Sequence, residues 1–323
     1  MPGDEFDIIN QHFTRQPVAR EDVLLGVGDD AALLLVPAGA ELVVCMDTLV
    51  AGVHFSADTP PAAIGHKALA VNLSDLAAMG AEPAWATLAL TLPEYHPVWL
   101  ADFARGFFAL ADHYHVQLVG GDTTHGPLTV TVQTHGFIRN GKALRRTGAQ
   151  PGDRVYVTGT LGDAGLALQL RSAANEGLRK RLDYPQPRIE AGLALRRHAS
   201  AVIDVSDGLL ADLGHLLEHD DLGARIDIDA LPHSPAFLEA IEQPGPGARP
   251  PFYELPLGAG DDYELCFTVP PPQCAEVEQR LGGLACGCTA IGVIEQEPGI
   301  RCLYRDGSDY QPASRGYLHF IDG

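Results

Sequence analysis

Apolar and polar residues alternate along the first half of the chain in blocks that predict strands separated by helices. Short apolar runs bounded by Gly, Pro or Asp predict strands over residues 42–46, 85–92, 116–119 and 128–138. Apolar residues recur at helical spacing over 60–79, and Gly80 ends that segment. A second amphipathic pattern predicts a helix over 99–113. This alternation is typical of an α/β fold.

The same alternation resumes after residues 140–153, which are rich in Gly, Arg and Pro. Predicted strands cover 155–158, 201–204, 226–228 and 263–269, and predicted helices lie over 162–170 and 188–198 and up to Leu217. The chain of 323 residues is long enough for two domains at about 150 residues each. We therefore predict an N-terminal domain over residues 1–145 and a C-terminal domain over residues 146–323.

The charge balance excludes several classes of partner. Asp and Glu number 42 and Lys and Arg number 22, so the formal net charge is −20. Nucleic-acid phosphates and anionic lipids repel such a chain, and no basic stripe compensates. The longest stretch without charged residues is shorter than the roughly 20 apolar residues of a membrane span. We therefore expect no nucleic acid and no membrane among its partners.

The N-terminus and the cysteines indicate a cytoplasmic protein. The first ten residues, MPGDEFDIIN, lack the basic and apolar regions of a signal peptide. The six cysteines show no paired spacing, which favours free thiols in a reducing compartment.

Aspartates gather at six places, most of them where predicted strands end or predicted helices begin, whereas Asp75 lies inside the helix predicted over 60–79. They are Asp29 with Asp30, Asp47, Asp75, Asp122, Asp204 with Asp207, and Asp261 with Asp262. For any one of them, turn formation or helix capping is the more common role. Six such places together favour a ligand crevice in which carboxylates repel one another unless a hard cation binds. The pattern therefore predicts Mg²⁺ that bridges carboxylates to phosphate groups.

Two glycine-rich segments are predicted to offer backbone N–H groups to phosphate. Residues 120–124 and 158–162 both follow predicted strands. Arg145 and Arg146 are equally consistent with phosphate contacts and with a solvated linker. No P-loop, zinc motif or Gly-x-Ser-x-Gly nucleophile motif occurs, which disfavours those chemistries.

Seven motifs together resemble the thiamine-monophosphate kinase family. In chain order they are LGVGDDAAL, MDTLVAGVHF, KALAVNLSDLAAMGAEP, LVGGDTT, RTGAQPGD, DVSDGLLADL and GDDYELCF. This family belongs to a superfamily that includes aminoimidazole ribonucleotide synthetase. The resemblance implies the two-domain fold of that superfamily, with an N-terminal mixed sheet that dimerises and a C-terminal α/β sandwich. It also implies transfer of the γ-phosphoryl group of ATP to thiamine monophosphate.

The resemblance also implies roles for individual residues. Several Mg²⁺ ions would be held by Asp30, Asp47, Asp75, Asp122, Asp204 and Asp207, with Cys45 and Met46 at the same site. ATP would be contacted by Gly121, Asp122, Arg146, Ser206 and Arg105, and the phosphorylated substrate by His54, Asp261 and Tyr317. The sequence does not decide whether a monovalent cation also binds. The implied assembly is a homodimer formed through the N-terminal domains.

Two departures from the family pattern bear on these roles. Cys45-Met46 stands where the family commonly has Ser-Thr. If the metal binds there through main-chain carbonyls, no ligand is lost. If it binds through side-chain hydroxyls, a ligand is missing. Asp261 stands where the family often has Glu, which gives it a shorter reach to the substrate.

The motifs contain no obvious nucleophile, so we expect direct transfer without a phosphorylated protein intermediate. Two alternatives remain open: another ATP-dependent synthetase of the superfamily, and a non-catalytic protein that binds nucleotides or divalent ions.

Overall fold

The computed structural model describes residues 5–14, 16–17, 19–242, 252–314 and 316–317. The chain divides into two compact units. Unit 1 comprises residues 1–76 and 81–141, and unit 2 comprises residues 77–80 and 142–323. The sequence placed its boundary between residues 145 and 146 and did not indicate that residues 77–80 group with the second unit.

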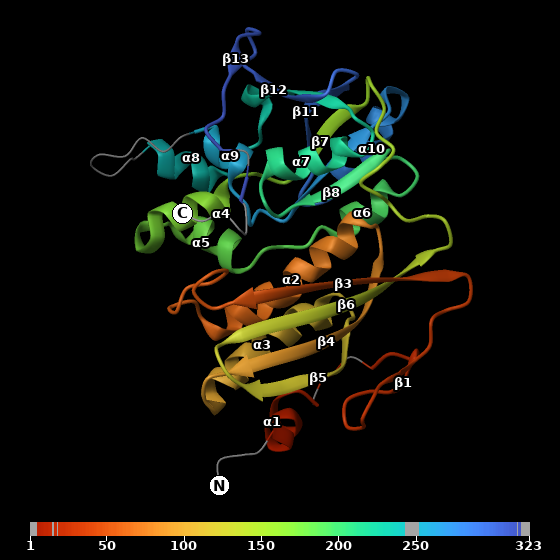
Figure 1. The fold of residues 1–323 in the computed structure, drawn as a ribbon, viewed down its shortest axis with the longest axis vertical. Coiled ribbons are helices and arrows are strands. Elements are labelled where there is room, and N and C mark those ends of the chain that lie inside the picture. Colours follow the sequence, from red (N-terminus) through yellow and green to blue (C-terminus); the bar gives the residue numbers. More distant parts are fainter. Residues whose placement is uncertain (1–4, 15, 18, 243–251, 315, 318–323) are drawn as a thin grey trace. The chain divides into compact units, whose positions relative to one another are not determined.

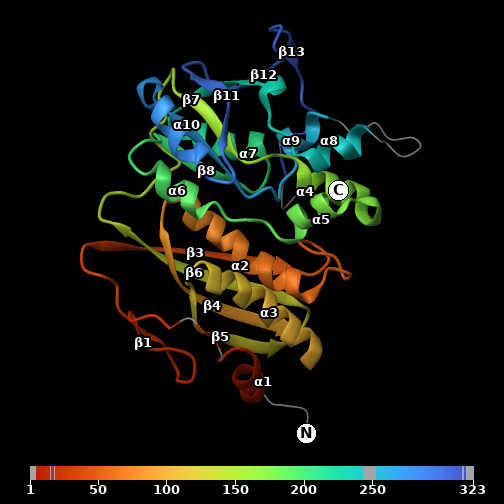
Figure 2. The same cartoon turned by 180° about the vertical axis from the view of Figure 1, so that it is seen from behind.

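Unit 1 is built on a four-stranded mixed sheet. Its elements are α1 (Glu5–His12), β1 (Val23–Leu25), β2 (Leu33–Leu34), β3 (Ala40–Val50), α2 (Pro61–Ala78), β4 (Glu82–Leu92), α3 (Pro97–His113), β5 (Gln117–His125) and β6 (Thr129–Arg139). The strand order is β3-β6-β4-β5, in which β4 and β5 are parallel and the other pairs are antiparallel. Helices α2 and α3 cover one face of this sheet (Figures 1 and 2).

Two glycines let α2 and α3 approach closely. A Cβ on Gly65 would lie 2.2 Å from Phe103 O, and a Cβ on Gly106 would lie 1.9 Å from Ala62 O. Both distances are shorter than any real contact, so only glycine fits at either position. The close crossing of the two helices therefore depends on the absence of a side chain at Gly65 and Gly106.

Strands β3 and β5 are longer than the sequence predicted. β3 pairs with β6 from Ala40 to Val50, so Asp47 lies within the strand and not at its end. β5 runs through the segment 120–124 that we expected to leave the sheet. It continues because Gly121 has no side chain: a Cβ there would lie 1.9 Å from Leu88 O on β4. The prediction that β5 ends at residue 119 was therefore wrong.

Unit 2 is built on a seven-stranded mixed sheet. Its strands are β7 (Arg154–Thr158), β8 (Ala201–Val205), β9 (Gly223–Asp227), β10 (Glu264–Val269), β11 (Cys288–Glu295), β12 (Gly299–Leu303) and β13 (Asp309–Tyr310). Its α-helices are α4 (Asp163–Leu170), α5 (Glu176–Asp183), α6 (Ile189–Leu195), α7 (Leu209–Glu218), α8 (Pro235–Glu242), α9 (Glu254–Gly258) and α10 (Cys274–Gly282). The strand order is β13-β12-β9-β11-β7-β10-β8, and only β12 and β9 pair in parallel.

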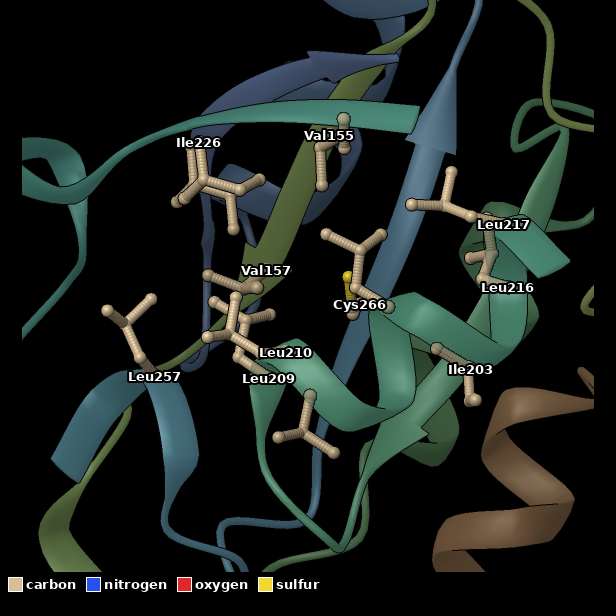
Figure 3. Packing of buried hydrophobic residues seen from close by; sticks show 14 of the residues in the cluster. Val155, Val157, Ile203, Leu209, Leu210, Leu216, Leu217, Ile226, Leu257 and Cys266 are labelled. Carbon is tan, nitrogen blue, oxygen red and sulfur yellow. The ribbon is translucent and has the colours of Figure 1, made fainter. Parts of the chain in front are cut away.

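The core of unit 2 lies between α7 and the sheet. Leu209, Leu213 and Leu216 recur at helical spacing on α7 and are fully buried. They belong to a cluster with strand residues such as Ile203 and Cys266 (Figure 3). Since side chains within a strand alternate between the two faces of the sheet, burial of every residue in β8 and β10 shows that both faces of these strands are covered. The predicted two-domain α/β fold, with a mixed sheet in the N-terminal domain, is confirmed.

Two further findings concern helices and thiols. No helix among the residues described here is long and apolar enough to cross a bilayer. All six cysteines are free, and two of them, Cys266 and Cys302, are buried.

Candidate active site

A polar cluster in unit 1 lies between β3 and α2. The Cys45 thiol donates a hydrogen bond of 3.3 Å to Asn72 O and lies 3.0 Å from Thr134 Oγ1. Burial and the nearby carboxylates of Asp75 and Asp47 raise the pKa of the Cys45 thiol. Cys45 is therefore a protonated thiol at neutral pH, and Asp47 and Asp75 share its surroundings.

The two departures at positions 45 and 46 have different surroundings. The side chains of β3 alternate, so Cys45 points toward α2 while Met46 points to the opposite face, where it is 62% exposed. A protonated thiol and a thioether are both poor ligands for Mg²⁺. The predicted metal role of these two residues is thereby restricted to their main-chain carbonyls.

Asn72 adds an oxygen that the sequence did not assign. It is fully buried, and its Nδ2 donates to Ala68 O at 3.1 Å. Its Oδ1 has no hydrogen-bond partner among the described residues, although a buried amide oxygen normally has one. Asn72 precedes Asp75 by three residues on α2, so both lie on one side of the helix. Amide and carboxylate oxygens are the donor set that Mg²⁺ prefers.

Asp122, another predicted metal ligand of unit 1, lies apart from this cluster. Asp122 on β5 pairs with Ala89, whereas Asp47 on β3 pairs with Val132, so three strand spacings separate the two aspartates. At about 4.8 Å per spacing this is roughly 14 Å. Asp30 lies in the exposed segment between β1 and β2, where its N–H donates to Asp29 Oδ1. Within one chain, Asp47 and Asp122 would therefore hold different ions.

Among the residues that the structure describes, no group of three or more His, Cys, Asp or Glu side chains is arranged to hold a metal ion. The six predicted metal ligands are divided between the units: Asp30, Asp47, Asp75 and Asp122 belong to unit 1, and Asp204 and Asp207 belong to unit 2.

A second group of polar residues lies in unit 2, around the turn Ser206-Asp207-Gly208. It follows β8, which contains the buried Asp204, and precedes α7. The N–H groups of all three residues donate to Asp212 Oδ2, at 3.0, 3.0 and 3.1 Å. Burial and the negative charges of Asp204 and Asp207 raise the pKa of Asp212 to about 7.

The segment 258–263 lies against this turn. Asp261 N donates to Ser206 O at 2.9 Å, and a Cβ on Gly260 would lie only 2.3 Å from the same oxygen. Tyr317 N donates to Asp207 O, also at 2.9 Å. Unit 2 thus brings together four predicted site residues: Ser206 and Asp207 from one motif, Asp261 from another, and Tyr317 from near the C-terminus.

The backbone of this segment is strained. Asp261 and Tyr263 both adopt positive φ angles, 67° and 50°, which non-glycine residues rarely do. The Tyr263 hydroxyl donates to Asp261 Oδ1 at 3.0 Å and so orients that carboxylate. Strain of this kind persists where the surrounding structure over-determines it, and it concentrates at functional sites.

A buried ionic network supports the same segment, and the sequence did not reveal it. The fully buried carboxylate of Glu264 accepts hydrogen bonds from Arg181, Arg188 and the Thr158 hydroxyl. Burial alone would raise the pKa of Glu264, but the positive charge of Arg188 and its hydrogen bonds, followed by Arg181, hold it below the ordinary value. The sequence feature that could have indicated this network is the presence of Arg181 and Arg188 in a chain with fewer basic than acidic residues.

Three N–H groups of the glycine turn at 158–162 already have acceptors within the chain. Gly159 N donates to Cys286 O, Leu161 N donates to Pro232 O, and Gly162 N donates to Asp262 Oδ2. Our expectation that these N–H groups face phosphate was wrong, because the chain already uses them. Asp262 is itself buried, and burial raises the pKa of its carboxyl well above the usual range.

Three predicted contacts lie elsewhere. His54 follows β3, and its Nδ1 accepts a hydrogen bond of 3.0 Å from Val50 N, which fixes the ring. Arg105 on α3 is exposed and pairs with Asp102. Arg146 is exposed in the segment that leads to β7.

Comparisons with known proteins agree with this architecture. Residues 28–138 match the family model described as AIR synthase related protein, N-terminal domain, and residues 150–305 match the corresponding C-terminal domain. The chain is 48% identical to thiamine-monophosphate kinase of Escherichia coli over 99% of both chains. The chain belongs to the thiamine-monophosphate kinase family.

Two solved structures of the thiamine-monophosphate kinase family share the fold. The crystal structure of thiamine-monophosphate kinase from Stenotrophomonas maltophilia is 48% identical, has a TM-score of 0.81, and is matched over 90% of this chain and 93% of that chain. AaThiL complexed with AMPPCP and TMP is 30% identical, with a TM-score of 0.76, over 88% of this chain and 89% of that chain.

Proposed function

We propose that this protein transfers the γ-phosphoryl group of ATP to thiamine monophosphate, which gives thiamine diphosphate and ADP. The observation that carries the proposal is the main-chain convergence in unit 2 of Ser206 and Asp207 with Asp261 and Tyr317. In this proposal the first two serve ATP and metal, and the last two serve the phosphorylated substrate. The binding of AMPPCP and TMP by AaThiL supports the same pair of substrates.

Mg²⁺ would be held by carboxylates of both units: Asp30, Asp47, Asp75 and Asp122 in unit 1, and Asp204 and Asp207 in unit 2. The donor set fits, because it consists of carboxylate oxygens, and the unpartnered Oδ1 of Asn72 lies three residues from Asp75. When bound, Mg²⁺ neutralises the charge that develops on the transferred phosphoryl group. Mg²⁺ held by these carboxylates would offset their negative charge, so that an acidic chain could bind two phosphorylated substrates.

The remaining roles are proposed from the resemblance to the family. We assign ATP contacts to Gly121, Asp122, Arg105, Arg146 and Ser206, and substrate contacts to His54, Asp261 and Tyr317. The bond from Val50 N to His54 Nδ1 makes that nitrogen an acceptor, so the neutral ring carries its proton on Nε2.

We further propose direct transfer, in which a phosphate oxygen of thiamine monophosphate attacks the γ-phosphorus of ATP. Burial and the nearby carboxylates of Asp75 and Asp47 raise the pKa of the Cys45 thiol, so this thiol stays protonated and does not offer a thiolate nucleophile. The protein then contributes in-line positioning and charge neutralisation. The six free thiols are consistent with a reducing cytoplasm, where we place the reaction.

The proposed assembly is a homodimer formed through unit 1. β3 is an edge strand of eleven residues, and its outward face exposes Leu42, Val44 and Met46. The nearby segment of β1 and β2 exposes Leu24 and Leu33. A long edge strand with an apolar face normally pairs or is covered. A second copy of this chain would cover it.

A ³¹P NMR time course tests the proposed reaction. With ATP, Mg²⁺ and thiamine monophosphate, we expect the monophosphate signal to disappear as the two diphosphate signals of thiamine diphosphate grow. Replacing thiamine monophosphate by thiamine is the control and should leave ATP intact. An unchanged monophosphate signal with folded protein at several Mg²⁺ concentrations would contradict the proposal.

A further inference from the structure

Asp212 holds the turn at the centre of the unit 2 site, although it lies outside that turn. It is the fourth residue of α7 and is 3% exposed. One of its oxygens, Oδ2, accepts hydrogen bonds from the N–H groups of Ser206, Asp207 and Gly208. Capping of α7 does not account for all three hydrogen bonds, because Ser206 and Asp207 precede the helix.

Two of the three peptide groups that donate to Asp212 also accept hydrogen bonds from residues that we predict to bind substrate. The peptide group between residues 206 and 207 gives its N–H to Asp212 and accepts a bond from Asp261 N on its carbonyl oxygen. The next peptide group gives its N–H to Asp212 and accepts a bond from Tyr317 N. Each peptide plane therefore links the Asp212 carboxylate to one substrate residue.

We propose that Asp212 is a positioning residue that fixes Asp261 and Tyr317 through these two peptide groups. This inference rests on the proposed function, which assigns substrate contacts to Asp261 and Tyr317. Asp212 is too buried to touch a substrate, so it acts only through the turn. A hydrogen bond accepted by Asp212 from a peptide N–H polarises that peptide group, which makes its carbonyl a better acceptor for the next N–H.

The local sequence makes the turn depend on Asp212. Gly208 is the residue before α7 and has no side chain with which to cap the helix; its φ is 121°. Three adjacent N–H groups would otherwise attract an anion such as a phosphate. Because Asp212 already occupies them, phosphate groups near this turn have to be bound by metal and by side chains.

Asp212→Asn tests this inference, with Asp153→Asn as the matched control. Asp153 is equally buried in unit 2 and accepts hydrogen bonds from Gln150 N and the Ser200 hydroxyl, near the opposite end of β8 from the turn. We expect Asp212→Asn to lower kcat/KM for thiamine monophosphate by about tenfold or more, because small misplacements of substrate are costly. Asp153→Asn should keep its kinetic constants and lose only thermal stability.

Amide hydrogen exchange supplies a second measurement that does not depend on activity. In the wild-type protein, the N–H groups of Ser206, Asp207 and Gly208 should exchange slowly, and in Asp212→Asn they should exchange faster. If Asp212→Asn does not fold, Asp212→Glu, which keeps the carboxyl group but moves it by one methylene, is measured by the same criteria.

Two results would overturn the role of Asp212: rapid exchange of the three amides in the wild-type protein, or kinetic constants within twofold of wild type in a folded Asp212 variant. Absence of thiamine monophosphate phosphorylation in the wild-type protein would instead overturn the proposed function. The exchange rates would still test the hydrogen bonds of Asp212 in that case.

Discussion

Single carboxylates carry most of the proposed chemistry. Asp75 lies beside Cys45 near Asp47, and Asp122 lies three strands away on β5. We expect Asp75→Asn and Asp122→Asn each to lower kcat by about 100-fold or more at saturating Mg²⁺, because charge neutralisation of the transition state is lost. Steady-state kinetics checks this, with Glu94→Gln, an exposed acid of the same unit, as the control. Near-normal kcat in both Asp variants would show that these aspartates are structural.

Glu264 is expected to affect stability more than chemistry. Its pKa in the folded protein lies below its ordinary value of 4.5, so its stabilisation is present above that value and is lost as pH falls through the folded pKa. Glu264→Gln removes the buried negative charge that Arg181 and Arg188 share, and should cost about 3 kcal/mol or more in the free energy of unfolding at neutral pH. Urea denaturation at pH 7 and pH 4 measures both effects, and the cost should shrink at the lower pH.

Glu276→Gln is the control for that experiment, because its pair with Arg280 is about half exposed. Such a pair should contribute less than about 0.5 kcal/mol. An equally small effect for Glu264→Gln would contradict the account of the buried network.

Among the helices, the contact between α2 and α3 depends on glycine. Gly106→Ala places a methyl group 1.9 Å from Ala62 O, so the helices must separate. We expect a loss of about 3 kcal/mol or more in the free energy of unfolding. Gly214→Ala is the control, because it lies within α7 with nothing inside 4 Å of the added Cβ, and should stabilise by up to about 1 kcal/mol. Equal effects of the two substitutions in chemical denaturation would refute the close approach.

The sequence predicted elements well where their patterns are local. The helix ending before Gly80 was predicted from apolar spacing and a glycine stop, and α2 ends at Ala78 with Gly80 at φ 65°. The ends of β3 and β5 were not predicted, because pairing with β6 and β4 extends both strands past polar residues. The same limit applies to the site: the motifs identified Ser206 and Asp261, but only the fold shows that their main chains meet.

For the whole molecule, the central structural prediction is dimerisation through the outward face of β3. Val44→Glu places a charge on an apolar strand face that is exposed in the single chain. We expect light scattering to report a dimer for the wild-type protein and a monomer for Val44→Glu. Leu238→Glu, on an exposed helix position of unit 2, is the control and should stay dimeric. A monomeric wild-type protein would contradict the proposed assembly.

The measurement that tests the central claim most directly follows the γ-phosphoryl group itself. The protein is mixed with [γ-³²P]ATP, Mg²⁺ and thiamine monophosphate, quenched at short times, and separated into protein and small molecules. We predict that the label moves from ATP into thiamine diphosphate at every time point and that none becomes attached to the protein. Label released as inorganic phosphate with no labelled thiamine diphosphate would contradict the proposed reaction, and label on the protein that later passes to thiamine diphosphate would contradict direct transfer.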